Sequence, residues 1–131
     1  MKLLHFRKVL EKIAITADQK PCPQGIQEYC NKDCPFRQAI SILGKRYTFD
    51  ILRVLSYDKA VRFKKIAESI PASTKTITER LGELVKFGVV KREAFAEIPP
   101  RVEYSLTEKG LDLEPALDYI RDWGVKWYTS K

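Results

Sequence analysis

The feature that most constrains this sequence is a change of period at Gly88, within the stretch from Arg62 to Tyr104. Before Gly88, apolar residues recur every three or four positions, which is the spacing of amphipathic helices. Towards Tyr104, apolar and polar residues alternate, which is the spacing of a half-buried strand. Two short helices followed by a hairpin make up a winged helix-turn-helix, so we predict a mainly α fold with a small β-hairpin wing.

Proline and serine mark the turn between the two helices. Pro71 cannot continue the first helix, and the three residues that end at Ser73 have the length of the turn. Ser73 is a good N-cap for the second helix, and Gly88 suits the C-cap region that follows it. The expected buried positions are Phe63, Ile66, Ala67 and Ile70 in the first helix and Ile77, Leu81, Leu84 and Val85 in the second.

The hairpin is expected to pair residues 89–96 with an alternating strand over residues 101–107. Residues 97–100 form its tip. The Pro99-Pro100 pair belongs in this connection because proline cannot donate ladder hydrogen bonds, and the pair makes the tip stiff.

Polar and basic side chains cover the outer face of the second helix. Helical geometry directs outward Lys75, Thr76, Glu79, Gly82, Glu83 and Lys86. The N-terminal end of such a helix is the part that enters a major groove, and its exposed amides attract phosphate. In the wing, Arg101 lies beside the stiff tip, from which arginine can reach a minor groove or a phosphate. The predicted DNA-binding residues are Arg62, Ser73, Thr74, Lys75, Thr76, Thr78, Arg80 and Arg101.

Several of these assignments have a plainer alternative. The serine and the threonines could only cap the helix. Arg101 could form a surface ion pair with Glu97 and Glu103, which contributes little energy. Gly82 in mid-helix costs roughly 1 kcal/mol relative to alanine, and either close packing or close approach of a DNA backbone could explain it.

Composition narrows the class of protein. A chain of 131 residues with 44% apolar content is expected to form one domain. A net charge of +7 and an isoelectric point near 9.4 favour an anionic partner. The single histidine, and the lack of a Ser-His-Asp set or a glycine-rich phosphate loop, lead us to expect neither an enzyme nor a cofactor. No apolar run approaches the roughly 20 residues that span a bilayer, so we expect no membrane partner and a cytoplasmic location.

Residues 3–13 have the apolar spacing of an amphipathic helix, and all three cysteines come after this segment in the chain. Cys22, Cys30 and Cys34 have the spacing C-x7-C-x3-C, which lacks the C-x2-C pair of zinc ribbons, so no metal site is predicted. Three states stay open: a Cys3His zinc site that includes His5, a disulfide between two of the cysteines, and three reduced thiols.

Cys34 differs from the other two cysteines in its setting. Asp33 can cap a helix whose first turn contains Cys34 and Pro35, and the amides at a helix N-terminus favour a thiolate. Lys32 and Arg37 would act in the same direction. Cys34 is therefore the predicted sensor thiol for an oxidant or a small electrophile. The expected buried stripe of its helix is Phe36, Ala39, Ile40 and Leu43.

Two further helices are expected. One precedes the helix-turn-helix and buries Tyr47, Ile51, Val54 and Leu55. The last begins near the N-cap Thr107, and Pro115 should kink it or mark the start of its regular part. The apolar stripe of this last helix consists of Leu113, Leu117, Ile120, Trp123 and Trp127. The stripe could be part of the core or form a dimer interface, and we favour the dimer interface. We predict a single domain, 1–131, whose N- and C-terminal helices dimerise and whose DNA-binding core spans about 34–110.

The run from Pro99 to Thr107 has an order and spacing that exceed what a generic hairpin demands. Further short motifs accompany it, namely Cys34-Pro35, Leu43-Gly44-Lys45, Leu52-Arg53, Arg62-Phe63, Ser73, Thr78, Arg80-Leu81, Gly88-Val89-Val90, Gly110 and Trp123. With these residues the chain resembles, from Cys34 to about Trp123, the HxlR family of winged helix-turn-helix transcriptional regulators, and the run from Pro99 to Thr107 is the most specific part.

This resemblance implies a homodimer that binds duplex DNA near promoters and whose terminal helices form the dimer interface. Some members of the family respond to electrophiles or oxidants through the cysteine that corresponds to Cys34. The chain departs from the family pattern at Arg46-Tyr47, where a tryptophan is usual, and in the additional Cys22 and Cys30.

The predicted function is therefore sequence-specific binding of double-stranded DNA by a homodimeric transcriptional regulator. Two other classes stay open: a winged-helix module that binds protein, and a redox or metal-binding protein built around the cysteines. A protein-binding module would need an apolar or acidic outer face on the second helix. Polar and basic residues lie there instead, partly offset by Glu79 and Glu83: Lys75, Thr76, Thr78, Arg80 and Lys86. Metal analysis and a thiol titration would separate the cysteine-based class.

Overall fold

The computed structural model describes residues 34–129 of the chain. Two compact units divide the chain between Ser41 and Ile42, and each unit is described by itself. The helix predicted over residues 3–13 lies outside the described residues, as do His5, Cys22 and Cys30.

Helix α2 (Pro35–Leu43) follows Cys34, whose carbonyl accepts the Gln38 amide at 3.0 Å. Cys34 therefore occupies the N-cap position. Cys34 was predicted in the first turn of this helix but lies one residue before it, because proline is favoured at the first helical position. Asp33, the predicted cap, lies outside the described residues.

The predicted buried stripe of α2 was also wrong. Helix α2 has no buried residue, and Phe36 and Ile40 are exposed to 62% and 46%. Ala39 is likewise exposed, and of the predicted stripe only Leu43 packs against the core, together with its neighbour Ile42. A helical period identifies an apolar side, but it does not identify what covers that side.

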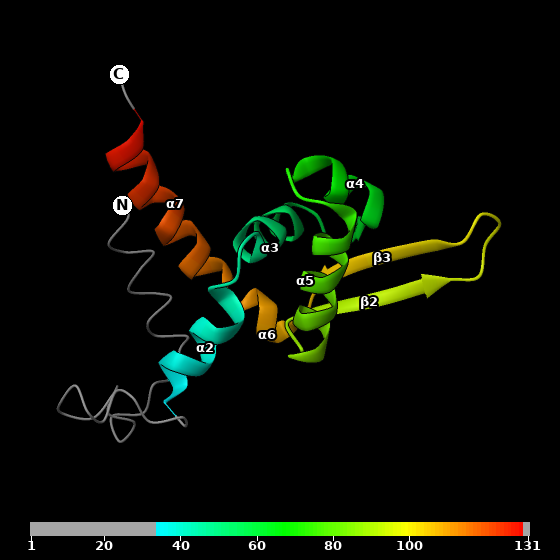
Figure 1. Cartoon of the computed structure of the whole chain (residues 1–131), viewed down its shortest axis with the longest axis horizontal. Coiled ribbons are helices and arrows are strands. Elements are labelled where there is room, and N and C mark those ends of the chain that lie inside the picture. Colours follow the sequence, from blue (N-terminus) through cyan, green and yellow to red (C-terminus); the bar gives the residue numbers. More distant parts are fainter. Residues whose placement is uncertain (1–33, 130–131) are drawn as a thin grey trace. The chain divides into compact units, whose positions relative to one another are not determined.

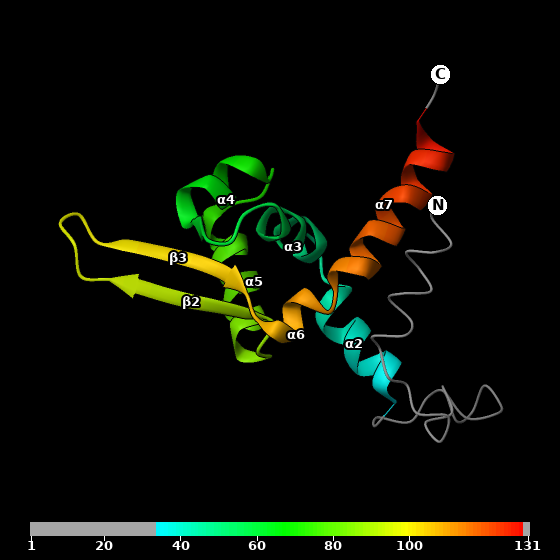
Figure 2. The ribbon, with the colours of Figure 1, turned by 180° about the vertical axis from the view of Figure 1, so that it is seen from behind.

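The second unit contains the helix-turn-helix and the wing. Its elements are α3 (Thr48–Tyr57), β1 (Val61–Arg62), α4 (Phe63–Ser69), α5 (Thr74–Lys86), β2 (Val90–Phe95), β3 (Arg101–Leu106), α6 (Glu108–Leu111) and α7 (Glu114–Tyr128). Helices α3, α4 and α5 gather at one end of the β2–β3 hairpin, which projects beyond them, while α7 leaves on the other side (Figures 1 and 2). The predicted fold class, mainly α with a β-hairpin wing, is confirmed.

The predicted helix-turn-helix is confirmed, including both ends of α5. The Ser73 hydroxyl accepts the Thr76 amide and caps the N-terminus. At the other end Gly88 has a φ of 75°, which glycine adopts without steric cost. The Gly88 amide bonds to the Val85 carbonyl and the Val89 amide to the Leu84 carbonyl. This bonding pattern is a Schellman motif, and it directs the chain into the wing.

The sheet has three strands in the order β1-β3-β2, all antiparallel. The hairpin pairs Val90 with Leu106 at its base and Phe95 with Arg101 near its tip, so the predicted hairpin is confirmed. The sequence did not predict β1, because two residues are too few to display an alternating period. Val61 in β1 is buried and pairs with Tyr104.

One apolar core joins α3, α4, α5 and the base of the sheet. Ile51 and Leu55 of α3 are buried as predicted, whereas Tyr47 and Val54 are only half-buried. The full set of buried core residues is Ile51, Leu52, Leu55, Val61, Ile66, Ile70, Ile77, Leu81, Leu84, Val89, Val90 and Tyr104.

The predicted C-terminal helix is divided in two. Thr107 caps the short α6, where its hydroxyl accepts the Gly110 amide at 3.2 Å. Pro115 lies in the first turn of α7 and marks the start of the regular helix, one of the two predicted outcomes. A Cβ on Gly110 would lie 2.3 Å from the Val89 carbonyl oxygen, so glycine is required where α6 meets the end of the helix-turn-helix.

Candidate nucleic-acid interface

The hydroxyl groups at the N-terminal end of α5 are engaged with the helix itself. The Ser73 hydroxyl accepts the Thr76 amide at 3.1 Å and lies 2.9 Å from the Thr76 hydroxyl. The Thr78 hydroxyl donates to the Thr74 carbonyl at 2.7 Å. A hydroxyl has two lone pairs, so the Thr78 oxygen can still accept a hydrogen bond from a base edge. The capping role of Ser73 is thus observed.

The outer face of α5 leaves Lys75 exposed beside the helix N-terminus. Glu79 and Lys86 are also exposed, and neither forms an ion pair with another residue of the described chain. A Cβ added to Gly82 would meet nothing within 4 Å. Packing against the rest of residues 34–129 therefore does not explain why a glycine occupies this exposed helical position.

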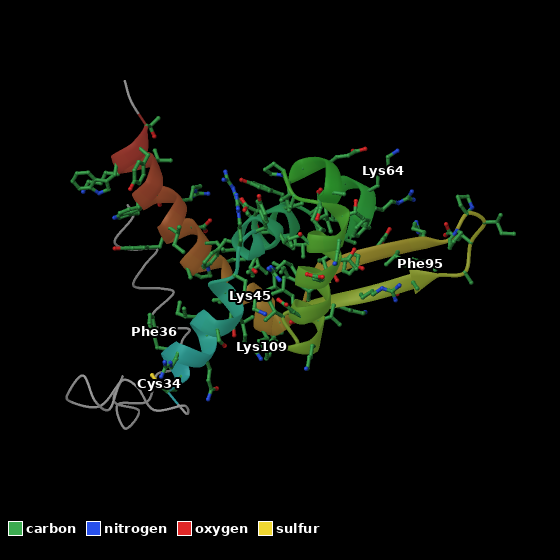
Figure 3. The ribbon with its side chains drawn as sticks, viewed as in Figure 1. Cys34, Phe36, Lys45, Lys64, Phe95 and Lys109 are labelled. Atoms are coloured by element: carbon green, nitrogen blue, oxygen red, sulfur yellow. The ribbon has the colours of Figure 1, made fainter. Side chains whose placement is uncertain are left out.

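Arg80 differs from Lys75, because its side chain turns back onto the protein. The Arg80 Nε donates to the Arg46 carbonyl at 3.1 Å, and its guanidinium lies 3.3 Å from the Glu83 carboxylate. The Arg80 side chain is only 20% exposed. The Lys45 ammonium shares the same Glu83 oxygen at 2.9 Å, and Figure 3 labels this lysine. Sequence reasoning missed Lys45, since no local pattern links it to a helix that begins 29 positions later.

In the wing, the Arg101 side chain lies along the hairpin. Its guanidinium lies 3.0 Å from the Glu97 carboxylate, 3.6 Å from Glu103 and 4.1 Å from the centre of the Phe95 ring. Its Nε is buried and has no hydrogen-bond partner within the described part of the chain. The structure therefore has the ion pairs that the sequence left open as an alternative. Arg92, on the neighbouring strand, is exposed and was not among the predicted residues.

The segment at the start of α4 adds further positive charge. Arg62 is exposed where β1 meets α4, and Lys64 points away from the fold (Figure 3). Lys65 is different, because its ammonium lies 2.6 Å from the Asp58 carboxylate. The predicted DNA-binding residues thus divide into two groups. Arg62, Ser73, Thr74, Lys75, Thr76 and Thr78 lie from the start of α4 to the first turns of α5, while Arg80 and Arg101 are bound within the protein.

The predicted sensor thiol belongs to the other unit. Cys34 is buried at the N-cap of α2, with Phe36 exposed in the following turn (Figure 3). Among residues 34–129 there is no group of three or more His, Cys, Asp or Glu side chains that could hold a metal ion. No helix in this range is long and apolar enough to cross a membrane.

Comparison with known proteins agrees with this geometry. The HxlR-like helix-turn-helix family matches residues 42–131. An uncharacterized HTH-type transcriptional regulator of Halalkalibacterium halodurans is 40% identical over 96 residues, which cover 72% of this chain and 85% of that protein.

Two solved structures of redox-related regulators share the fold. The reduced form of the transcriptional regulator YodB from Bacillus subtilis has a TM-score of 0.63 and 39% identity, and the match covers 72% of this chain and 94% of that one. The redox regulator HypR in its oxidised form has a TM-score of 0.68 and 28% identity, with 74% and 100% covered. The chain therefore belongs to the HxlR family of helix-turn-helix proteins, which are DNA-binding transcriptional regulators and not enzymes.

Proposed function

We propose that this regulator binds specific sequences of double-stranded DNA as a homodimer, with the first turns of α5 in a major groove. One observation carries the proposal: Lys75 is exposed beside the capped N-terminus of a helix whose other side is fixed in the core by Ile77 and Leu81. A rigid helix end with exposed amides and a cation suits both phosphate attraction and base readout. The exposed Arg62 and Lys64 would add contacts to the flanking phosphates.

The surface of α7 supports the homodimer. Ile120, Trp123 and Trp127 are exposed to 49%, 51% and 64%, although they form one apolar stripe. Large aromatic side chains are enriched in protein interfaces and seldom gather on a solvated surface. A second copy of α7 would cover this stripe symmetrically, which is the commonest arrangement of soluble oligomers. The role of residues 1–33 in this dimer stays a prediction.

We also propose that oxidants or small electrophiles control DNA binding through Cys34. The position of Cys34 at the N-cap of α2 directs the first amides of this helix towards the residue, and such amides favour a thiolate. The solved structures of YodB and HypR are described as reduced, diamide-treated and oxidised forms, so relatives of this chain undergo redox chemistry. The buried state of Cys34 means that a reagent must first gain access by local opening.

The salt dependence of duplex binding tests the DNA-binding proposal. For each phosphate neutralised, log K should fall with log salt at a slope of about −0.9, and a dimer doubles the number of contacts. Lys64→Ala should weaken all duplexes similarly, whereas Lys75→Ala should change the preference at particular base pairs. A slope near zero, or no duplex binding at low salt, would contradict the proposal.

The cysteine proposal has its own test. DNA affinity is measured before and after mild oxidation for Cys34→Ser, with Cys22→Ser and Cys30→Ser as matched controls. We expect oxidation to change the affinity of the wild type and to leave that of Cys34→Ser unchanged. If Cys34→Ser responds like the wild type, Cys34 is not the sensor, and the DNA-binding proposal stands unaffected.

A further inference from the structure

A polar cluster joins the recognition helix α5 to the turn that precedes α3. The Arg80 Nε donates to the Arg46 carbonyl at 3.1 Å, across 34 positions of the chain. The Glu83 carboxylate lies 3.3 Å from the Arg80 guanidinium and 2.9 Å from the Lys45 ammonium. We call Lys45, Arg46, Arg80 and Glu83 the turn cluster. Arg80 and Glu83 lie three residues apart, so they attach one edge of α5 to the turn.

The turn that receives these contacts has a constrained backbone. Tyr47 has a φ of 70°, in the left-handed region that residues other than glycine seldom adopt. Such a conformation persists only where the surrounding structure holds it. The Arg46 guanidinium lies 4.9 Å from the centre of the Tyr47 ring, and the Lys45 carbonyl accepts the Thr48 amide at 3.2 Å. The turn therefore offers α5 a fixed point outside the apolar core.

The hydrogen bond and ion pairs of the turn cluster restrict the rotation of α5 about its own axis, which the apolar core alone does not. The buried side of α5 is held by Ile77, Leu81 and Leu84, and apolar contacts of this sort are non-directional. Such contacts alone would permit small rotations of α5 about its own axis. Hydrogen bonds and ion pairs from Arg80 and Glu83 oppose that rotation because they depend on angle and distance.

Arg80 itself is poorly placed to neutralise a phosphate. Its guanidinium has a carbonyl and a carboxylate as partners, and only 20% of its side chain is exposed. A phosphate contact would require at least one of these bonds to break. Glu83 carries a negative charge on a helix that faces DNA, yet two cations, Arg80 and Lys45, offset this charge.

We infer that Arg80 and Glu83 are positioning residues for DNA recognition. Their contacts with the turn fix the rotation of α5 about its own axis. This rotation determines how the side chains of Lys75 and Thr78 are directed towards the base pairs. Neither residue contacts DNA. This inference rests on the proposed DNA-binding function, and it changes the predicted role of Arg80 from direct contact to support.

The decisive comparison is between Glu83→Gln and Glu79→Gln. Both variants remove one negative charge from the same helix, but Glu79 is exposed and has no ion pair with another described residue. Removing negative charge alone should raise DNA affinity in both variants. We expect Glu79→Gln to do so, whereas Glu83→Gln should lower the ratio of specific to non-specific affinity by about tenfold, the factor that corresponds to one charge-assisted hydrogen bond.

Arg80→Gln and Lys64→Gln give a second, independent readout, because Lys64 is exposed and is the proposed phosphate contact. A cation that neutralises a phosphate contributes about 0.9 to the salt slope in each subunit. We expect Lys64→Gln to reduce the slope by about 0.9 in each subunit and Arg80→Gln to leave the slope unchanged while lowering specificity. Lys45→Gln, at a half-exposed position that does not endanger folding, should reproduce the effect of Glu83→Gln. The double variant Lys45→Gln/Glu83→Gln should have a ratio of specific to non-specific affinity no lower than that of Glu83→Gln alone.

The possible failures are distinguishable. If Glu83→Gln and Lys45→Gln leave the ratio of specific to non-specific affinity unchanged, or if Arg80→Gln lowers the salt slope, the positioning role is wrong and DNA binding stands. If the wild type binds no duplex, the proposed function itself is wrong. Urea unfolding of each variant identifies a loss that comes from misfolding, and in that case Lys45→Gln decides the question.

Discussion

Helices α5 and α7 have the same kind of sequence pattern but differ in the burial of their apolar sides. Each is amphipathic, with 13 and 15 residues. Helix α5 buries Ile77, Leu81 and Leu84 almost completely, whereas α7 buries no residue and leaves Trp123 half-exposed. A helical period therefore shows that a helix has an apolar side, but the available neighbours determine whether the same chain covers it.

The neighbours explain the difference. Helix α5 is surrounded by α3, α4 and the base of β2, so three elements cover its apolar side. Helix α7 packs against α3 near its start, where Leu117 is half-buried against the core. Its later turns extend past the core (Figure 2). The first turns of α7 thus pack on the core of the chain, and its last turns leave large apolar side chains exposed.

The largest effect should come from the core side of α5. Leu81→Ala removes a fully buried side chain and leaves a cavity, so the free energy of unfolding should fall by about 2–5 kcal/mol. Urea denaturation measures this change. A loss under about 1 kcal/mol would mean that α5 is held less firmly than its burial indicates.

The next effect concerns the exposed stripe of α7. Trp123→Ala combined with Trp127→Ala should weaken the dimer by about 2–4 kcal/mol, because central aromatic residues dominate interface energies. Sedimentation equilibrium should then detect folded monomers, while Lys126→Ala on the same helix remains dimeric. A dimer that survives the double substitution would locate the interface elsewhere, for example at the exposed Phe36 and Ile40 of α2.

The helix caps provide a smaller effect. Ser73→Ala removes the side-chain acceptor of the Thr76 amide and should cost about 1 kcal/mol. Helix α7 has no side-chain cap at Leu113, so the equivalent contribution is missing there. Thermal unfolding of Ser73→Ala tests this value. Ser73→Asp is the matched control, because aspartate is an equally good N-cap and should retain the stability.

The smallest effect comes from two mid-helix glycines, Gly82 in α5 and Gly124 in α7. An added Cβ would meet nothing within 4 Å at either position, so each change to alanine should stabilise the fold by up to about 1 kcal/mol. If the outer face of α5 approaches a DNA backbone, Gly82→Ala should weaken DNA binding despite the added stability. Gly124→Ala should leave DNA affinity unchanged. Equal DNA affinities for the two variants would remove the close-approach explanation for Gly82.

The local features of the fold could be predicted from the sequence. Pro71 and Ser73 bound the turn of the helix-turn-helix, and Gly88 permits the left-handed end of α5. Each of these residues acts on its near neighbours in the chain, so a short stretch contains all the necessary information. The hairpin was predictable for the same reason, because its period and its Pro99-Pro100 tip are local.

Features that depend on distant partners could not be predicted. The Arg80 side chain turns inward because the Arg46 carbonyl lies beside it, and no pattern in the sequence brings these two residues together. The exposed stripe of α2 failed as a core prediction because helical period does not identify a partner. Arg101 was predicted with both outcomes open, since arginine beside two glutamates can bind either them or a phosphate.

Selection from a random library of duplex DNA by the purified protein tests sequence-specific binding by a dimer most directly. Two symmetry-related α5 helices should enrich an inverted repeat whose half-sites lie about one helical turn, 10 to 10.5 base pairs, or a multiple of that apart. The enriched duplex should bind one dimer, and its affinity should fall steeply with salt. Enrichment of a single half-site without symmetry would contradict the dimer, and no enrichment at low salt would contradict sequence-specific DNA binding.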